Sequence, residues 1–580
     1  MKRVALLAIG PAALALCPTP LLAHGSEAAV GTVAPAVVAR TTTYSALTIA
    51  PGRIPVAPEG KTLTLTVNGE EFGLAPGTYT GNVVLAVKDD IPVKFMELPT
   101  HHFRAAVYVK DGVPVPEKSV SSAVKSGEVG EREADLLRIS SYGKEFNGVI
   151  ADGKGTYTVD RPIIHLVGNG GDDFAGFGAA LMSTGDAELI VNRPFIRTEG
   201  AVRTALFVGG NSTMRVNDAE IEVFNGTLPA DYEFTVDVGK MMEVPWMLGL
   251  SGNVRASNLV GKGTLYITNS HIRAQGWGAL STDAAEVTRM YVYDSLIETL
   301  DSGYGSYSIG DSHNRFFHSI INAADIGSIL AGEASITFTD GSIVNSGRYG
   351  VMMHSGQGGG TLTIDKGSTL HSKDTAIQVK GRGTNIVVDD AKVIAGNGII
   401  LQAMENDDPF LKAMMRGDAP PGMSAPPPGT EMMLPSAGPQ FSPDVTGTFS
   451  NTTLTGDFYN GRTQEGAMAL RFENAAVTGI ISTSLVAPAT GKEPTRETYQ
   501  EIGHVVNTPA PTETDNGLSV SLDGKSRWTI TGTSYLTGLT LEPGATVNPA
   551  SGRKLSMLVN GRRTPLRPGD FKGAITLEIK

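Results

Sequence analysis

The stretch from Gly278 to Gln402 repeats one short pattern, seen in Ser295-Leu296-Ile297, Ser319-Ile320-Ile321 and Ser342-Ile343-Val344. An aliphatic residue stands two places after a serine, and the pattern recurs about every 24 residues. A repeat of this length cannot bury its own apolar face, so neighbouring copies must stack on one another. We expect the aliphatic members to form one buried column: Ile272, Ile297, Ile321, Val344, Leu370 and Ile394, the last of them following Lys392 instead of serine.

A second column has the same period, and each member opens a short apolar run. Segments such as Leu362-Thr363-Ile364 and Ile386-Val387-Val388 alternate as strands do, with Gly, Asp or Asn at their ends. The predicted fold class is therefore all-β: a right-handed parallel β-helix solenoid with small β-rich terminal modules. The second column consists of Gly278, Gly305, Gly327, Gly350, Thr375 and Gly398.

Composition fits this fold and limits the possible partners. The chain has 580 residues, 70 of them glycine, and only 6% are aromatic, which suits tight turns between short strands. A solenoid can absorb such a length in one continuous core. The formal net charge of −12 argues against a nucleic-acid partner, which would require a basic surface.

The N-terminus has the features of an export signal. Met1-Lys2-Arg3 precedes an apolar stretch from Val4 to Leu16, and cleavage is predicted after Ala23. The protein is therefore expected to be secreted, periplasmic or on the cell surface, and no later apolar run is long enough to cross a bilayer. The only cysteine, Cys17, lies inside the signal, where it is either an ordinary residue of the apolar stretch or a lipid anchor.

The repeats and the compositional changes divide the chain into seven parts. Residues 67–88 and 559–580 follow one template, with nine of 22 aligned positions identical, including Asn68-Gly69 and Asn560-Gly561. Each copy should form a small antiparallel unit that either caps the solenoid or docks on a surface or a second copy. The predicted parts are the signal peptide (1–23), an N-terminal β module (24–110), a mixed connecting region with a possible short helix between Val120 and Leu137 (111–164), the β-helix (165–405), a Met/Pro-rich loop insertion (406–441), C-terminal rungs (442–545) and a C-terminal β module (546–580).

The Met/Pro-rich insertion leaves three interpretations open. Its methionines could bind Cu(I), Arg416-Gly417-Asp418 could contact a receptor, or the segment could simply be a loop that leaves the solenoid. Prolines at this density cannot join a β ladder.

Outward side chains in adjacent rungs lie about 4.8 Å apart, so polar columns suit extended ligands. Counting from the column glycines predicts one outward face, with Asp311, His354 and Arg382 at its margin. The turn from Asp311 to Arg315 adds a carboxylate, an imidazole and a guanidinium, which could act on a sugar chain. The candidate catalytic residues are Asp283, Asp311, His313, Arg315 and Lys380; Ser281, Ser308 and Gln378 share the predicted face.

Aromatic residues near the column glycines could stack on sugar rings. Together with three polar neighbours they form the candidate substrate-binding set: Trp277, Tyr304, Tyr307, Tyr349, His354, Gln378 and Arg382. The alternative is that all of these are ordinary turn and ladder residues of a solenoid.

Evidence for a metal site is weak. Asp172-Asp173 and Asp407-Asp408 could hold Ca²⁺ through oxygen ligands, but no EF-hand or zinc spacing accompanies them. No cofactor is predicted.

The rungs from Lys262 to Asp408 resemble right-handed parallel β-helix proteins of the pectate-lyase-like class. That resemblance implies an elongated secreted protein with a groove on one flank, and many members cleave polysaccharides with Ca²⁺ or a carboxylate pair. The segment from Leu518 to Leu541, with Arg527-Trp528-Thr529, looks like repeats of bacterial surface proteins. No lyase or hydrolase motif matches residue by residue, and fold alone does not decide function.

Two functions are therefore predicted as alternatives. The first is a secreted protein that binds, and could cleave as a lyase or hydrolase, an extracellular polysaccharide or cell-surface glycan along one flank. The second is a non-catalytic adhesin or matrix protein that uses the solenoid as a scaffold. Two close carboxylates in a groove would favour the enzyme, and a flat Ser/Thr/Asn-lined flank would favour the adhesin.

Overall fold

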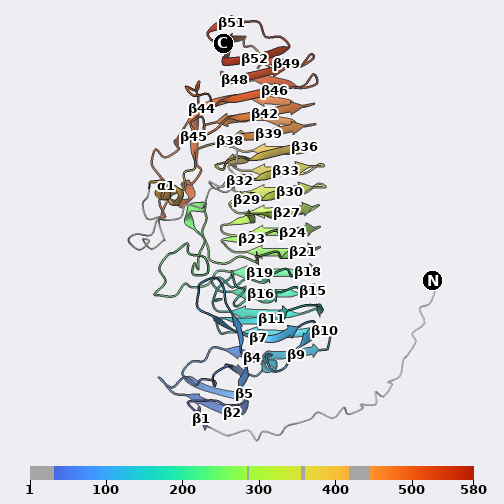
Figure 1. Ribbon diagram of the computed structural model, residues 1–580, viewed down its shortest axis with the longest axis vertical. Helices are drawn as coiled ribbons and strands as arrows, with labels where there is room; N and C mark the ends of the chain where they lie inside the picture. Colours follow the sequence, from blue (N-terminus) through green and yellow to red (C-terminus); the bar gives the residue numbers. More distant parts are fainter. Residues whose placement is uncertain (1–31, 284–285, 355–358, 417–443) are drawn as a thin grey trace, which may run out of the picture.

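A computed structural model describes residues 32–283, 286–354, 359–416 and 444–580, without the side chains of residues 32, 411 and 414–416. The chain forms one long stack of parallel coils with a small module at each end (Figure 1). The predicted parallel β-helix is confirmed. The predicted signal peptide and most of the Met/Pro-rich insertion lie outside the described residues.

Each regular coil contributes one strand to each of three parallel sheets. Sheet 1 contains β7 (His101–Lys110), β11 (Phe146–Asp152), β14 (Leu181–Ser183), β17 (Leu206–Val208), β20 (Ser257–Leu259), β23 (Gly278–Asp283), β26 (Tyr304–Ile309), β29 (Ile326–Ala331), β32 (Val351–His354), β35 (Ile377–Val379), β38 (Ile399–Ala403), β41 (Asp457–Asn460) and β44 (Ile481–Pro488).

Sheet 2 follows sheet 1 along each coil and is also paired without interruption. It contains β12 (Thr156–Asp160), β15 (Glu188–Asn192), β18 (Thr213–Asn217), β21 (Thr264–Thr268), β24 (Thr288–Tyr293), β27 (Ser312–Phe317), β30 (Ser335–Thr339), β33 (Thr361–Asp365), β36 (Asn385–Asp389), β39 (Val445–Ser450), β42 (Met468–Glu473) and β46 (Leu518–Leu522).

Sheet 3 completes the coil. It contains β13 (Ile163–Val167), β16 (Phe195–Glu199), β19 (Glu220–Phe224), β22 (His271–Ala274), β25 (Leu296–Thr299), β28 (Ile320–Ala323), β31 (Ile343–Ser346), β34 (Thr369–Ser372) and β37 (Lys392–Ala395), and near the C-terminus β40 (Thr453–Thr455), β43 (Ala476–Gly479), β47 (Arg527–Ile530) and β49 (Thr546–Pro549).

The aliphatic column predicted from the repeat lies in sheet 3, and five of its six members are correct. Ile272 pairs with Ile297, and the register continues through the next three members, all of them buried. The sixth is wrong by one residue: Leu370 pairs with Val393, and Ile394 points outward with 47% of its surface exposed. The small residue two places earlier in that coil is Ala391, not Lys392, so the pattern persists with alanine replacing serine.

In most coils, one residue at the corner between sheet 2 and sheet 3 has positive φ; it is usually Asp or Asn, and in four coils it is Arg161, Arg193, His318 or Lys366. Asp218, Asn269 and Asp294 occupy this position with φ values of 54°, 48° and 49°. Asp and Asn tolerate this left-handed conformation better than most residues, which explains the acidic and amide residues that separate these strands. Asn269 also donates to Asp218 at 2.6 Å and links two successive corners.

The two end modules share one topology. The N-terminal module contains β1 (Thr32–Val33), β2 (Thr42–Ile49), β3 (Lys61–Val67), β4 (Glu70–Phe72) and β5 (Gly77–Asp89). The C-terminal module contains β48 (Ser534–Leu541), β50 (Leu555–Val559), β51 (Arg562–Thr564) and β52 (Gly569–Ile579). β2 pairs antiparallel with β5 as β48 does with β52, and both pairings contain a bulge at the same place.

The similarity between the modules also extends further along the sequence than the template we recognised. Leu47-Thr48 and Pro51-Gly52 match Leu539-Thr540 and Pro543-Gly544. The N-terminal copy is therefore one coil with its cover, placed before the main solenoid.

Residues 111–164 belong mostly to the solenoid, unlike the mixed connecting region that we expected. The predicted helix between Val120 and Leu137 is wrong: only η1 (Ser121–Ala123) is helical there, followed by β9 (Val124–Val129) and β10 (Glu133–Ser141). Gly127, with φ at +105°, lies inside β9 at the bulge in its antiparallel pairing with β10. β10 pairs in parallel with both β12 and β13 and so starts the stack.

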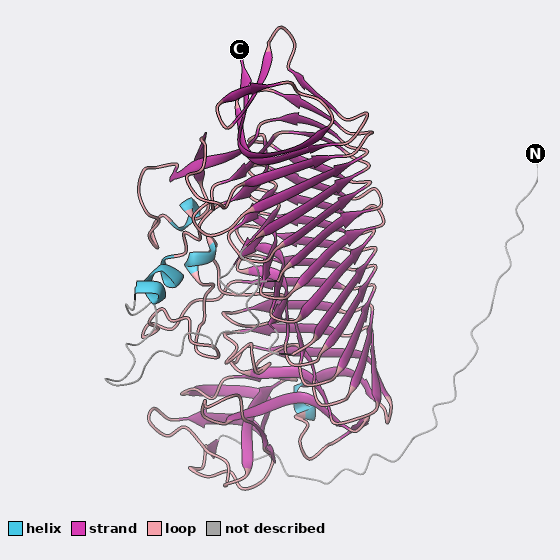
Figure 2. Ribbon diagram, turned by 45° about the horizontal axis from the view of Figure 1, so that its top comes forward, coloured by secondary structure: helices cyan, strands magenta, loops and turns pink. Residues whose placement is uncertain are grey.

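Three segments cover the outer surface of sheet 1, at residues 225–256, 404–416 and 487–515. They contain η2 (Trp246–Leu248), α1 (Pro409–Arg416), η3 (Tyr499–Glu501) and β45 (Val505–Pro509). Figure 2 shows this material on one flank only, while the strands of the opposite flank are bare.

In the described part of the chain, no helix is long and apolar enough to cross a membrane. β6 (Ile91–Val93) and β8 (Val113–Pro114) flank β7 at the start of sheet 1.

Candidate functional site

The predicted aromatic residues lie under the segments that cover sheet 1. Trp277, Tyr304 and Tyr349 are at most 3% exposed and pack with Val244 and Leu250 of the 225–256 segment. The expected open flank is therefore wrong here, because the excursions between coils fold back onto this sheet. Burial raises the pKa of Tyr304 to about 12, so its hydroxyl stays protonated at neutral pH.

A buried ion cluster lies under the same cover. The Arg255 guanidinium donates to Asp173 at 2.6 Å and to Asp283, and its plane packs on the Trp277 ring at 4.7 Å. Burial raises the pKa of Asp283 despite the nearby guanidinium, whereas the two carboxylates keep the pKa of Arg255 above its usual value although burial opposes its charge. Asp283 is thus held in an internal ion pair, away from any open groove.

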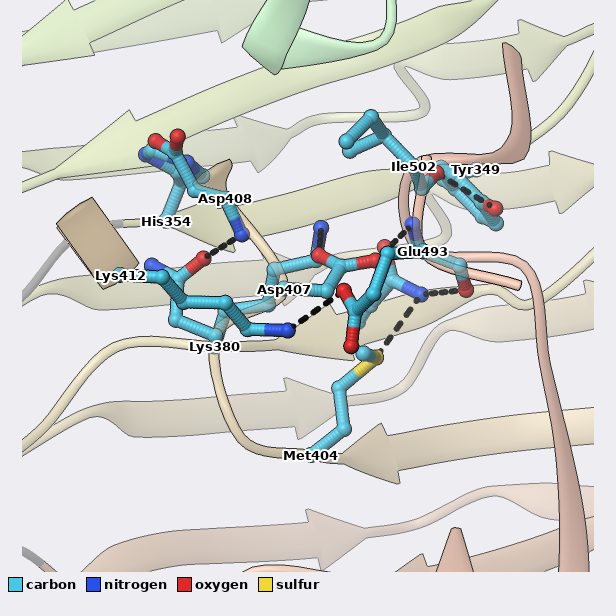
Figure 3. Close-up of polar contacts among 12 residues, drawn as sticks. Tyr349, His354, Lys380, Met404, Asp407, Asp408, Lys412, Glu493 and Ile502 are labelled. Carbon is cyan, nitrogen blue, oxygen red and sulfur yellow. Dashed lines mark hydrogen bonds and ion pairs between the residues drawn. The ribbon is translucent and has the colours of Figure 1, made fainter. Parts of the chain in front are cut away.

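Lys380 and Gln378 fasten the covering segments to sheet 1 (Figure 3). The fully buried Lys380 ammonium pairs with Asp407, and Gln378 Nε2 donates to the Gly503 carbonyl at 2.6 Å. Asp407 also accepts from the Gly503 amide at 2.6 Å, so one carboxylate joins two of the three segments. Burial disfavours its charge, but Lys380 keeps the pKa of Asp407 below the usual value.

His354 also contacts one of the covering segments, next to the pair of Lys380 and Asp407. Its Nε2 lies 3.3 Å from an oxygen of Asp408, whose other oxygen accepts from the Phe410 amide at the start of α1 (Figure 3). Both side chains are largely buried. The imidazole therefore contacts the chain's own cover, while Arg382 is exposed in the turn after β35.

The two acidic pairs that could have held calcium are both engaged by cationic or histidine side chains. Asp172 lies 3.2 Å from His101, and its neighbour Asp173 holds Arg255. Asp407 and Asp408 contact Lys380 and His354. Across the described ranges, no group of three or more His, Cys, Asp and Glu side chains is placed to hold a metal ion.

Asp311, His313 and Arg315 lie on a different face, the outer surface of sheet 2. His313 Nε2 is 3.2 Å from Asp311, and its Nδ1 is 2.7 Å from the Ser335 hydroxyl in the next coil. The predicted set is therefore divided between two faces. Register explains part of the error: Ser308 pairs with Thr282 and points inward, so the outward residue in that coil is Tyr307.

Four aromatic residues that our sequence reasoning missed surround Arg315. Tyr266 stacks on Tyr291 with ring centroids 5.1 Å apart, and Tyr293 stacks on Phe317 at 4.6 Å. All four side chains are half-buried. We call Tyr266, Tyr291, Tyr293 and Phe317 the aromatic platform. In the sequence, these four aromatic residues alternate with the buried Leu265, Met290, Val292 and Phe316, and this alternation could have identified them.

Cations flank the aromatic platform. The Arg215 guanidinium lies 4.2 Å from the Tyr266 ring centre and is held by Glu188 at 2.9 Å. Arg289 and Arg315 are exposed on β24 and β27, and within the described residues neither has a hydrogen-bond or ion-pair partner. This strip can thus offer ring faces and free guanidinium groups to a ligand.

Toward the C-terminus, hydroxyl groups replace the aromatic rings on the same face. Thr337 pairs with Arg315, and the outward positions continue with mainly Ser and Thr. We call this the hydroxyl track: Ser335, Thr337, Thr361, Thr363, Thr446, Thr448, Ser519, Ser521 and Thr540.

One further hollow of about 860 Å³ lies at the corner between sheet 3 and sheet 1. Asn345 donates to Asn322 at 2.9 Å there, and Asn322 donates to Glu298 at 3.1 Å. The side-chain amides that line this side hollow therefore largely hydrogen-bond within the protein. For this reason it is a weaker candidate ligand site than the aromatic platform.

The protein resembles no known family closely enough to assign any of these residues a role: no protein-family model matches the chain, and no curated protein matches it.

Proposed function

We propose that the protein is an extracellular β-helix that binds an extended acidic polysaccharide along the outer surface of sheet 2. The observation that carries this proposal is the half-exposed aromatic platform beside Arg289 and Arg315, for which the described part of the chain supplies no hydrogen-bond or ion-pair partner. Aromatic rings pack on the C–H faces of sugars, and guanidinium groups bind carboxylates with two parallel hydrogen bonds. The regular spacing between coils repeats these contacts along the chain axis.

Charge supports an acidic ligand confined to this strip. The whole chain carries a formal net charge of −12, so most of its surface repels a polyanion. Free guanidinium groups at the aromatic platform are a local exception. Binding through exposed charges should therefore weaken as salt screens the attraction.

A second candidate function is a non-catalytic adhesin or matrix scaffold. The hydroxyl track favours it, because it is a flank lined by Ser and Thr rather than a groove with two opposed carboxylates. The first candidate covers binding of the polysaccharide with or without cleavage, whereas the scaffold does not cleave its ligand.

Titration calorimetry of the mature chain with polygalacturonate and alginate would test the proposal. Tyr291→Ala and Arg315→Ala should each weaken binding about tenfold, as the loss of one stacking or charged contact implies. Asn345→Ala in the side hollow is the matched control and should bind normally. Equal binding by all three variants would contradict the proposal.

Cleavage needs a separate measurement on the same polymers. New reducing ends or absorbance from unsaturated products would favour the enzyme, and His313→Ala should then abolish the signal. Binding without either product would favour the scaffold.

A further inference from the structure

The C-terminal module carries a charge opposite to that of the rest of the chain. Residues 546–580 contain seven Lys or Arg and two Asp or Glu, a formal net charge of +5. The other 40 Lys or Arg and 57 Asp or Glu give residues 1–545 a formal net charge of −17. All seven cationic side chains of the module are exposed: Arg553, Lys554, Arg562, Arg563, Arg567, Lys572 and Lys580.

Most of these cations have no partner within the protein. The two carboxylates of the module are already engaged, because Asp570 accepts a hydrogen bond from Thr540 at 2.8 Å and Glu578 lies 3.2 Å from Lys580. Among the residues that the structure describes, five of the seven cationic side chains form no hydrogen bond or ion pair: those of Lys554, Arg562, Arg563, Arg567 and Lys572. Their positive charge is therefore available to an external partner. We call Arg562, Arg563 and Arg567 the cap arginines.

The N-terminal module shows that the shared template does not need these cations in order to fold. At the positions of the cap arginines it has Glu70, Glu71 and Ala75, although the two modules share one topology. A charge of either sign would keep an open strand edge from associating. A surplus of positive charge at one end of an acidic protein therefore indicates an anionic partner.

The cap arginines lie at the extreme end of the solenoid. Figure 1 shows β51, which contains Arg562 and Arg563, beyond the last coils of the stack. Arg563 pairs with Leu558, which pairs with Thr576. The neighbouring Met557 is buried in the core, so Arg563 shares the opposite face of this small sheet and points away from the solenoid.

The positive charge is spread over this end. The backbones of Lys554 and Lys580 bond to each other at the start of β50, whereas Arg562 pairs with Val559 at its other end. The five residues of β50 correspond to about 17 Å of extended chain. A small anion can reach only one of these groups, but a planar array of phosphate groups can meet all of them at once.

The end offers no apolar side chains for insertion into a bilayer. No large apolar side chain is exposed in residues 546–580, every one of which the structure describes. Contact with a membrane would therefore be electrostatic and confined to the headgroups.

We propose that the C-terminal module docks the protein end-on to an anionic phospholipid surface. Guanidinium groups bind phosphates with two parallel hydrogen bonds, and each basic residue near an anionic membrane adds to the attraction. The same surface repels the acidic remainder of the chain, so the solenoid projects away from it. This docking does not depend on the aromatic platform.

Cosedimentation of the mature chain with vesicles would test the proposal. The protein should bind vesicles made of phosphatidylglycerol and phosphatidylcholine in equal amounts, and should not bind vesicles of phosphatidylcholine alone. Binding should weaken as salt screens the attraction. Arg562→Gln, Arg563→Gln and Arg567→Gln combined should weaken it about a hundredfold, because three basic contacts are lost.

Two matched variants separate docking from folding. Replacing all three cap arginines by lysine keeps the charge and should leave binding within about tenfold of that of the unaltered protein. Arg132→Gln, Arg138→Gln and Arg382→Gln combined remove the same charge from exposed positions elsewhere and should bind the vesicles normally.

Three results would overturn the proposal. The first is equal vesicle binding by the two glutamine variants, and the second is binding to phosphatidylcholine alone or binding that persists at high salt. The third is a polygalacturonate affinity that depends on the cap arginines while the anionic vesicles stay unbound, which would assign this end to an acidic polymer instead of a lipid surface.

Discussion

The two end modules have the same backbone topology but bury different faces. In the C-terminal copy, Ile575 and Leu577 of β52 pack into the main core of the solenoid. The equivalent Val83 and Leu85 of β5 pack instead on residues 34–49, in a small core of their own. The N-terminal copy covers one coil of its own. The opposite face of its sheet, which we call the reverse face, packs against the main solenoid.

The reverse faces carry the sequence difference that this arrangement requires. Val84 and Ala86 of the N-terminal copy are buried in the main core. Thr576 and Glu578 take their places in the C-terminal copy and are partly exposed. One template thus serves as an internal partition where its second face is apolar and as an end cap where that face is polar.

The largest expected effect is at the partition. Glu71 is fully buried and accepts hydrogen bonds from Arg104 at 3.0 Å and Ser141 at 2.6 Å. Glu71→Ala leaves buried donors without a partner and should lower the free energy of unfolding by about 3–5 kcal/mol. Arg563→Ala, at the equivalent exposed position of the C-terminal copy, should change it by less than about 0.5 kcal/mol. Hydrogen exchange across residues 61–141 for Glu71→Ala and across residues 534–579 for Arg563→Ala would measure the two effects, and equal effects would contradict the comparison.

A pH effect should appear at the N-terminal part of the molecule. Burial, with the nearby Asp173, raises the pKa of Asp172 to about 6, against the effects of the Phe174 amide and His101. The folded state therefore binds this proton more tightly than the unfolded state, so stability falls as pH rises from about 4 to about 6 and is constant above. Asp172→Asn should remove this slope and add at most about 3 kcal/mol at pH 7.

Chemical denaturation at several pH values would check this expectation. Asp570→Asn in the C-terminal module is the control. An unchanged slope in Asp172→Asn would refute the assignment.

Replacing the asparagine of the turn that both modules share should destabilise the protein to the same extent in either module. Asn68 and Asn560 have φ values of 52° and 50°, and each accepts a hydrogen bond at 2.9 Å from a backbone amide, of β5 and of β52 respectively. Replacing either by alanine strains the backbone and removes the contact, which should cost about 1–2 kcal/mol. Thermal unfolding of both variants would test this, and a large effect in only one copy would show that the modules differ locally as well.

The smallest effect on stability is expected at the polar reverse face. Thr576→Val combined with Glu578→Ala should change the free energy of unfolding by less than about 0.5 kcal/mol. It would create an apolar face next to an open strand edge, so the variant should associate in solution. Light scattering during size-exclusion chromatography would detect this, with Thr80→Val as a control. A variant that stays monomeric would show that Glu578 does not prevent association.

The sequence predicted the fold because stacking enforces a repeat that can be read directly, as at Ile272 and Ile297. It predicted the site poorly because the residues that cover sheet 1 come from irregular excursions, whose folding back leaves no periodic signal. Trp277 and Tyr349 were therefore assigned to an open flank although they are buried. Tyr291 and Phe317 could have been found by counting alternation outward from Val292 and Phe316.

In most coils the left-handed corner between sheet 2 and sheet 3 is formed by a single residue of that coil, usually Asn or Asp. A duplicated coil would bring its own corner, pair with identical neighbours and leave both end modules unaltered. Gene segments encoding such units could therefore be gained or lost singly, and the reach of the molecule would change in steps of about 4.8 Å.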